Sequence, residues 1–151
     1  MRKLIKKVLS DEECATLCNL AKTEKKKNPA LPHDIFAKIQ ELINSQIQVS
    51  WEHPSYYRLE NIGRSHGWHV DTGDTNQMPW CNYGCSILLN SAKDAGFLEY
   101  RDGAKLSFKE HYGNLAIHSS DVEHRTIHQP FARVTFLAFL KVGTENGGQG
   151  A

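Results

Sequence analysis

The stretch GWHVDTGD, from Gly67 to Asp74, places a histidine and an aspartate on either side of one valine. Side chains two residues apart on a β-strand point to the same face. His69 and Asp71 are therefore expected to reach into one volume, where an imidazole and a carboxylate suit a divalent metal ion. Because this pattern is common by chance, the stretch alone predicts a strand end with a candidate metal pair.

The spacing of apolar residues changes from a helical pattern to a strand pattern at Trp51. Before it, Ser10 and Glu13 form a capping-box pattern, and a second helix with an apolar stripe is expected from about Asp34. After it, the apolar runs SYYRLEN, GWHVD, CSILLN, GFLEY, KLSF, NLAIHS, RTIH and ARVTFLAFL are separated by turn residues and predict antiparallel strands. This order indicates an α+β, mainly β domain, with a β-sandwich or barrel and helices packed on one side.

Composition limits the classes of protein. The chain of 151 residues is 40% hydrophobic with a net charge of +1, which is typical of a globular domain and gives no surface for tracking phosphates. We expect one domain over 1–142 and a flexible tail over 143–151, with nucleic acid not a partner. The absence of a membrane-length apolar run or signal-peptide pattern predicts a cytoplasmic location and no membrane partner. The four cysteines are expected to be reduced and packed, and no oligomeric state is predicted.

A third ligand would turn the pair into a metal site, and the late strands offer His118, His124 and His128. His124 is favoured by its position relative to Arg133. The Gln-Pro step in EHRTIHQPFARVT marks a turn, and a hairpin centred there would place His124 opposite Arg133. His118 and His128 are then interpreted as a strand residue and a turn residue.

Arg133 and Thr135 are expected to face the interior of the barrel together. An arginine buried among apolar strand residues is costly unless an anion meets it. Arg133 therefore predicts either a salt bridge to a protein carboxylate or a bidentate clamp for the carboxylate of a ligand.

These motifs, in this order and spacing, resemble the Fe(II)/2-oxoglutarate-dependent oxygenases, and within them the prolyl-4-hydroxylase-like type. The resemblance covers Tyr56 to Leu140 and rests on HVD, a distal histidine and Arg-x-Thr nine residues after that histidine. YYRLENIGRSHGW, SILLN and NLAIHSSDVEHRTIHQPFARVTF are similar to the blocks of the family around these residues. GFLEY has one glycine where the family usually has two.

The resemblance implies a double-stranded β-helix (a jelly roll) in which His69, Asp71 and His124 hold Fe(II). This set is the facial triad of two histidines and one carboxylate, which leaves iron positions open for other ligands. The implied activity is a dioxygenase that uses O2 and 2-oxoglutarate to hydroxylate an organic substrate and releases succinate and CO2. The prolyl-hydroxylase type favours a peptide or protein side chain as that substrate, and a small molecule stays open.

The resemblance also implies how 2-oxoglutarate is held. Its far carboxylate would bind Arg133, which joins the triad among the catalytic residues. Thr135 and a tyrosine, either Tyr57 or Tyr56, would donate hydrogen bonds to it. The relatives that repair nucleobases have a second arginine six residues after the first, and here that position is Phe139.

Other assignments stay open beside this one. A cupin-like dioxygenase that does not use 2-oxoglutarate typically has three histidine ligands, and it would leave the inward Arg133 unexplained. A non-catalytic jelly-roll binding module would need no distal histidine.

At the mouth of the site, the loop 72–80 and Arg64 are candidates for substrate contact. His66 is also near the entrance, but its spacing from His69 predicts the opposite face of the strand. Trp68 is expected to pack outside the site.

Overall fold

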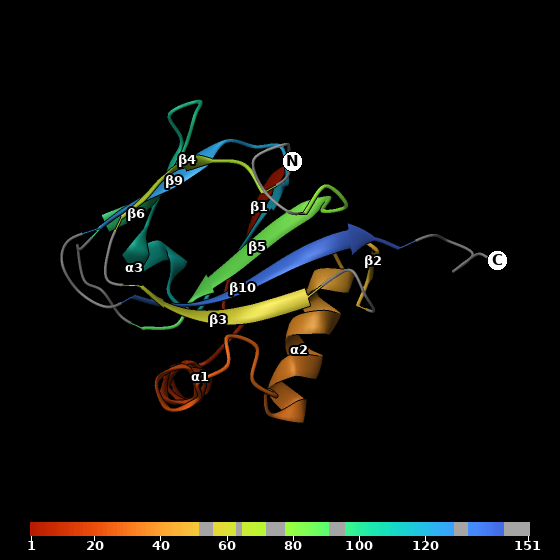
Figure 1. Cartoon of the computed structure of the whole chain (residues 1–151), viewed down its shortest axis with the longest axis vertical. Helices are drawn as coiled ribbons and strands as arrows, with labels where there is room; N and C mark the ends of the chain where they lie inside the picture. Colours follow the sequence, from red (N-terminus) through yellow and green to blue (C-terminus); the bar gives the residue numbers. More distant parts are fainter. Residues whose placement is uncertain (52–55, 63–64, 72–77, 91–95, 129–132, 144–151) are drawn as a thin grey trace.

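The computed structural model describes residues 1–51, 56–62, 65–71, 78–90, 96–128 and 133–143. Its strands form two curled antiparallel sheets, and α1 and α2 lie against the outer side of the larger sheet (Figure 1). The elements, in chain order, are β1 (Arg2–Ile5), α1 (Asp11–Thr23), α2 (His33–Asn44), β2 (Val49–Ser50), β3 (Tyr56–Ile62), β4 (His66–His69), β5 (Tyr83–Leu88), β6 (Gly96–Tyr100), β7 (Lys105–Ser107), α3 (Phe108–His111), β8 (Leu115–Ser119), β9 (His124–His128) and β10 (Arg133–Val142).

The two sheets have different strand orders. The larger runs β1-β8-β5-β10-β2, with β3 also paired to β10, and the smaller runs β4-β9-β6-β7. Every strand that the sequence predicted is present, and the predicted jelly roll with N-terminal helices on one sheet is confirmed. The edge strand β1 was not predicted, because a run of four residues with two basic side chains carries almost no apolar periodicity.

The main core fills the space between the helices and the larger sheet. Ser10 caps α1, its hydroxyl accepting a hydrogen bond from the Glu13 backbone N–H, so the predicted capping box is confirmed. Alternate residues of β10 face this core, and they are fully buried: Val134, Phe136, Ala138 and Leu140. The intervening residues of β10 point to the other side of the sheet, into the space between the two sheets.

The predicted hairpin between His124 and Arg133 is wrong. Strand β9 pairs with β4 and β6 in the smaller sheet, whereas β10 pairs with β3 and β5 in the larger one. In this topology the chain changes sheet between the two strands, so both residues face the same interior from opposite sides. A turn signal in the sequence carries no information about the sheet that the following strand enters.

The structure also bears on the predictions about the cysteines and about membrane-spanning helices, whereas some of the predicted segments lie outside the described residues. Cys14, Cys18, Cys81 and Cys85 are all buried and free, as the sequence predicted. No helix in the part of the chain that the structure describes is long and apolar enough to cross a membrane. Arg64, most of the loop 72–80 and the tail beyond residue 143 lie outside the described residues.

Candidate metal and cosubstrate site

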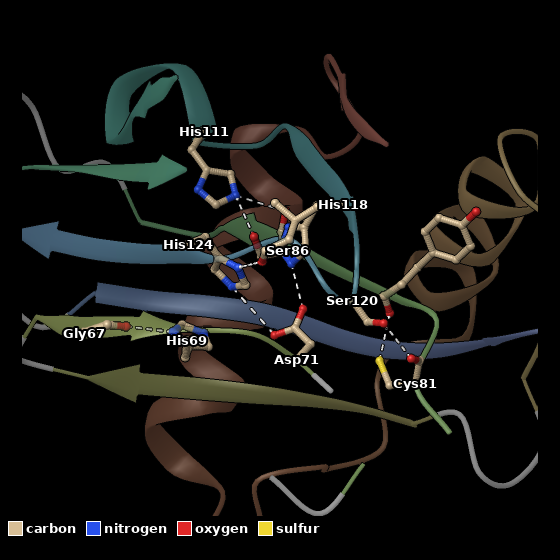
Figure 2. A network of polar contacts seen from close by, with 11 residues as sticks. Gly67, His69, Asp71, Cys81, Ser86, His111, His118, Ser120 and His124 are labelled. Atoms are coloured by element: carbon tan, nitrogen blue, oxygen red, sulfur yellow. Dashed lines mark hydrogen bonds and ion pairs between the residues drawn. The ribbon is translucent and has the colours of Figure 1, made fainter. Parts of the chain in front are cut away.

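Three side chains converge between the sheets. His69 ends β4 and is the cross-strand partner of His124, the first residue of β9. Asp71 follows two residues later, with its backbone N–H donating to the Ser120 carbonyl 2.9 Å away. One ligand atom from each of His69, Asp71 and His124 lies within 4.8 Å of the other two. The structure thus brings together the three residues that the sequence singled out, and Figure 2 shows them pointing toward one another.

Backbone carbonyls fix the orientation of both imidazoles. Nδ1 of His69 lies 2.8 Å from the Gly67 carbonyl, and Nδ1 of His124 lies 2.8 Å from the Val122 carbonyl. A carbonyl oxygen only accepts hydrogen bonds, so in each ring Nδ1 carries the donated proton. An imidazole that carries its one proton on Nδ1 has a free lone pair on Nε2, which is the form that binds a metal ion.

Burial and neighbouring charges set the protonation states of the cluster. Burial alone would raise the pKa of Asp71, but the hydrogen bond from His118 and the nearby histidines outweigh it and leave that pKa below its usual value. Burial, followed by the proximity of His118, lowers the pKa of His124 to about 4. At neutral pH the cluster therefore presents an ionised carboxylate and a neutral imidazole, as metal binding requires.

His118 is a site residue that sequence reasoning missed. It lies in β8, is 4% exposed, and places Nε2 2.7 Å from Oδ2 of Asp71. The sequence pattern predicts only a strand residue at this position. The signal that could have found it is a histidine at a buried position of the apolar run NLAIHS, where a polar side chain needs a partner.

A cavity of about 290 Å³ lies between the two sheets and includes the three converging residues in its wall. Arg133 and Thr135 line it from β10, and both are nearly buried, at 6% and 8% exposed. The guanidinium carbon of Arg133 lies 6.0 Å from the centre of the Phe108 ring. The cavity therefore has a carboxylate-and-imidazole cluster on one wall and a buried guanidinium on the facing sheet.

His111 extends the polar wall from the short helix α3. Its Nε2 lies 3.0 Å from the Ser86 carbonyl and 3.1 Å from the Ser86 hydroxyl (Figure 2). Burial lowers the pKa of His111 to about 4, and the nearby positive charge of Arg133 acts in the same direction. His111 is thus neutral at physiological pH, so it adds hydrogen bonding to the cavity without adding charge.

The buried state of His111 makes the stability of the protein depend on pH. The unfolded chain takes up this proton near pH 6.5, whereas the folded protein resists until about pH 4. Between these values the unfolded state binds more protons, so stability is lost as the pH falls, by up to about 3 kcal/mol for this residue. Urea unfolding of metal-free protein at pH 7 and pH 4.5 should show a smaller loss in His111→Gln than in the wild type. Equal losses would contradict the assignment.

The structure places both tyrosines that were expected to contact 2-oxoglutarate, Tyr57 and Tyr56, outside the wall of the cavity. Tyr57 pairs with Ala138 and faces the helices, and its hydroxyl donates to the Pro29 carbonyl 2.8 Å away. The Tyr56 hydroxyl lies 3.4 Å from the Met78 sulfur, and neither tyrosine lines the cavity. Because side chains alternate along β3, Tyr57 points to the side of the sheet that faces the helices and away from the cavity.

Two charged residues of β3 line the cavity instead. Arg58 and Glu60 form an ion pair, with Nη2 and Oε2 2.8 Å apart. Their register partners on β10 are Leu137 and Thr135, which also line the cavity. The cavity wall formed by β3 therefore carries a positive group, Arg58, and a negative group, Glu60, that the sequence had not indicated.

The expected position of His66 is also corrected. A register shift between His66 and His69 in the β4–β9 pairing turns the two side chains to the same side. Their rings stack with centroids 4.1 Å apart, and both line the cavity. Such a bulge changes the face of the strand to which the following side chains point, and the residue pattern does not reveal it. Trp68 packs outside the cavity, as expected, with Arg101 and Arg125 over its ring.

The sheet order and the flanking helices define the fold as a jelly roll. Solved prolyl 4-hydroxylases have the same fold. The viral collagen prolyl hydroxylase of Paramecium bursaria Chlorella virus-1, solved as a 2-oxoglutarate complex, superposes with a TM-score of 0.69 at 16% identity, over 95% of this chain and 96% of that one.

Two further solved structures show the same similarity. A prolyl-4-hydroxylase from Pseudomonas putida gives a TM-score of 0.65 at 14% identity, covering 93% of this chain and 92% of the other. HygX from Streptomyces hygroscopicus, solved with nickel and 2-oxoglutarate bound, gives 0.60 at 10% identity, covering 93% and 81%. No protein-family model and no curated protein matches the sequence. The comparisons therefore establish the fold.

Proposed function

We propose that this protein is an Fe(II)- and 2-oxoglutarate-dependent dioxygenase that hydroxylates an organic substrate, with succinate and CO2 as coproducts. One observation carries the proposal: His69, Asp71 and His124 converge in a buried cavity that Arg133 lines from the opposite sheet. The fold shared with solved 2-oxoglutarate oxygenases supports it. A cupin-like site of three histidines is not favoured, because the converging set includes a carboxylate.

The three converging residues fit a divalent iron ion. They offer two imidazole nitrogens and one carboxylate oxygen, the donor set of non-haem Fe(II) oxygenases. The backbone carbonyls that hold Nδ1 of His69 and of His124 fix both rings before a metal arrives. When bound, Fe(II) would supply the activation of O2 that side chains alone do not provide.

The opposite wall of the cavity fits the far carboxylate of 2-oxoglutarate. Arg133 would bind it through two parallel hydrogen bonds, and Thr135, two residues along β10, would donate a third from its hydroxyl. Leu88 and Phe108 are almost fully buried and line the same cavity, so they would pack against the methylene groups and exclude water. Because His111 is neutral, Arg133 and not His111 would supply the positive charge that meets this carboxylate.

For the substrate, we propose a peptide or protein side chain, as in a prolyl hydroxylase. Two solved proteins with this fold are prolyl hydroxylases by name, which supports the choice. The ion pair of Arg58 and Glu60 lines the cavity from β3 and is partly exposed, at 27% and 13% of the two side chains. These two groups would contact the polar backbone of a peptide whose side chain enters toward the metal.

The substrate proposal is tested by product analysis. Purified protein is incubated aerobically with Fe(II), 2-oxoglutarate, ascorbate and a library of proline-containing peptides. Succinate is followed by NMR and the peptides by mass spectrometry. We expect succinate to form together with a peptide that gains one oxygen atom, and neither product to form with His124→Ala. Succinate formation that no peptide stimulates, but that a free amino acid does, would contradict the peptide assignment.

A further inference from the structure

The carboxylate of Asp71 is seated against a cross-strand pair of the larger sheet. Gly84 of β5 and His118 of β8 are direct register partners. The side chains of Asp71 and His118 are only 7% and 5% exposed, and Nε2 of His118 lies 2.7 Å from Oδ2 (Figure 2). Asp71 arrives at this pair from the end of β4, in the smaller sheet. The contact therefore joins the candidate metal site to the sheet that faces it.

Gly84 provides the space for this arrangement. A Cβ atom at position 84 would overlap Oδ2 of Asp71, and it would lie 2.9 Å from Nε2 of His118 and 3.0 Å from Cγ of Asp71. Such separations are shorter than carbon atoms tolerate, so any other residue would displace the carboxylate. Among the described residues, the glycines with positive φ are Gly103 and Gly113, and Gly84 is not one of them. The glycine is thus required by the close approach of Asp71 and not by the backbone conformation.

The chemistry of the pair fixes the direction of the hydrogen bond. An ionised carboxylate only accepts, so Nε2 of His118 donates to Oδ2 of Asp71. Nδ1 of His118 is buried and has no hydrogen-bond partner among the residues that the structure describes. Burying a histidine with one nitrogen unsatisfied costs free energy. The hydrogen bond from Nε2 to Asp71 offsets part of this cost.

The two oxygens of Asp71 therefore have different surroundings. Oδ2 is held between His118 and Gly84, whereas Oδ1 faces the ligand cluster, 3.7 Å from Nε2 of His124. A carboxylate free to rotate can bind a metal through both oxygens and occupy two coordination positions. Here the hydrogen bond ties one oxygen away from the cluster.

We propose that His118 is a positioning residue, which with Gly84 holds the Asp71 carboxylate so that it binds the metal through Oδ1 alone. One-oxygen coordination by Asp71 would leave more of the metal open to the other ligands that the proposed function needs. The inference deepens the proposed function and rests on its metal site. It assigns a role to two residues outside the facial triad.

Metal binding without turnover tests this role, with Co(II) as a redox-stable probe. Leucine and glutamine have similar volumes, but only glutamine keeps an N–H donor near the position of Nε2. Calorimetry of folded metal-free protein should show His118→Leu binding Co(II) about 10- to 100-fold more weakly than the wild type. His118→Gln should recover most of the affinity. The visible spectrum of bound Co(II) should change in His118→Leu and return toward the wild-type spectrum in His118→Gln.

A second variant tests the contact between Gly84 and the same carboxylate. Gly84→Ala leaves His118 in place but puts a methyl group where Oδ2 lies, so it should weaken Co(II) binding and alter the spectrum as well. It keeps the proposal testable if His118→Leu does not fold. Wild-type Co(II) affinity and spectrum in either folded variant would overturn the proposal, and so would a wild-type protein that binds no Co(II). A protein that shows the predicted series but does not bind 2-oxoglutarate would keep the positioning role and refute the proposed function.

Discussion

Asp71→Ala is expected to weaken Fe(II) binding by more than about 100-fold, beyond the loss typical of residues that only support a ligand. Asp71 is the one anionic member of the converging set, so its removal leaves two neutral imidazoles to hold a divalent cation. The variant also leaves Nε2 of His118 without its acceptor. Succinate formation should fall to the background of free iron. Anaerobic calorimetry with Fe(II) measures the first effect, and NMR the second.

Asp71→Asn is the matched control for this prediction. It keeps the shape of the side chain and an oxygen that can accept from His118, but it removes the charge. We expect it to fold as the wild type does and still to bind Fe(II) far more weakly. Circular dichroism and thermal unfolding of both metal-free variants establish that the fold persists. Turnover at the wild-type rate in either variant would remove Asp71 from the metal site.

Arg133→Ala is expected to weaken 2-oxoglutarate binding by about 2–5 kcal/mol, the usual cost of truncating one partner of a buried charge pair. Its side chain is 6% exposed and lines the cavity from the sheet opposite His124. Fe(II) affinity should change little, because Arg133 lies outside the converging set of ligands. Calorimetry of the protein loaded with Fe(II), titrated anaerobically with 2-oxoglutarate, measures the change.

Two further variants separate the effect of charge from that of geometry. Arg133→Lys keeps the positive charge but has no planar fork for two parallel hydrogen bonds, so it should recover only part of the affinity. Arg58→Ala removes a different arginine from the same cavity and should leave 2-oxoglutarate binding close to that of the wild type. An unchanged 2-oxoglutarate affinity in Arg133→Ala would show that this residue is not the clamp.

Much of the fold could be predicted because each strand carries its own periodicity. The alternation in ARVTFLAFL, for example, separates the core face of β10 from the face that bears Arg133 and Thr135. The convergence of His69 and Asp71 follows from the same local rule. These predictions depend only on residues close together in the chain, and such local rules are what one sequence expresses most directly.

The errors arise where the answer depends on distant segments. Which sheet β9 enters is decided by pairing with β4 and β6, so the hairpin with Arg133 could not be judged from its turn. The bulge that brings His66 beside His69 is a feature of the β4–β9 pairing. His118 contacts an aspartate 47 residues earlier in the chain, and that contact exists only once the two sheets face each other.

The central claim is that the converging residues bind Fe(II) and that the cavity beside them binds 2-oxoglutarate. Anaerobic titration with Fe(II), followed by 2-oxoglutarate, tests both parts in one optical measurement. We predict that a weak visible charge-transfer band, the sign of a 2-oxoacid chelated to Fe(II), develops in the wild-type protein and is absent in Asp71→Ala. Fe(II) binding without this band in the wild type would contradict the use of 2-oxoglutarate, and no binding of Fe(II) would contradict the metal site itself.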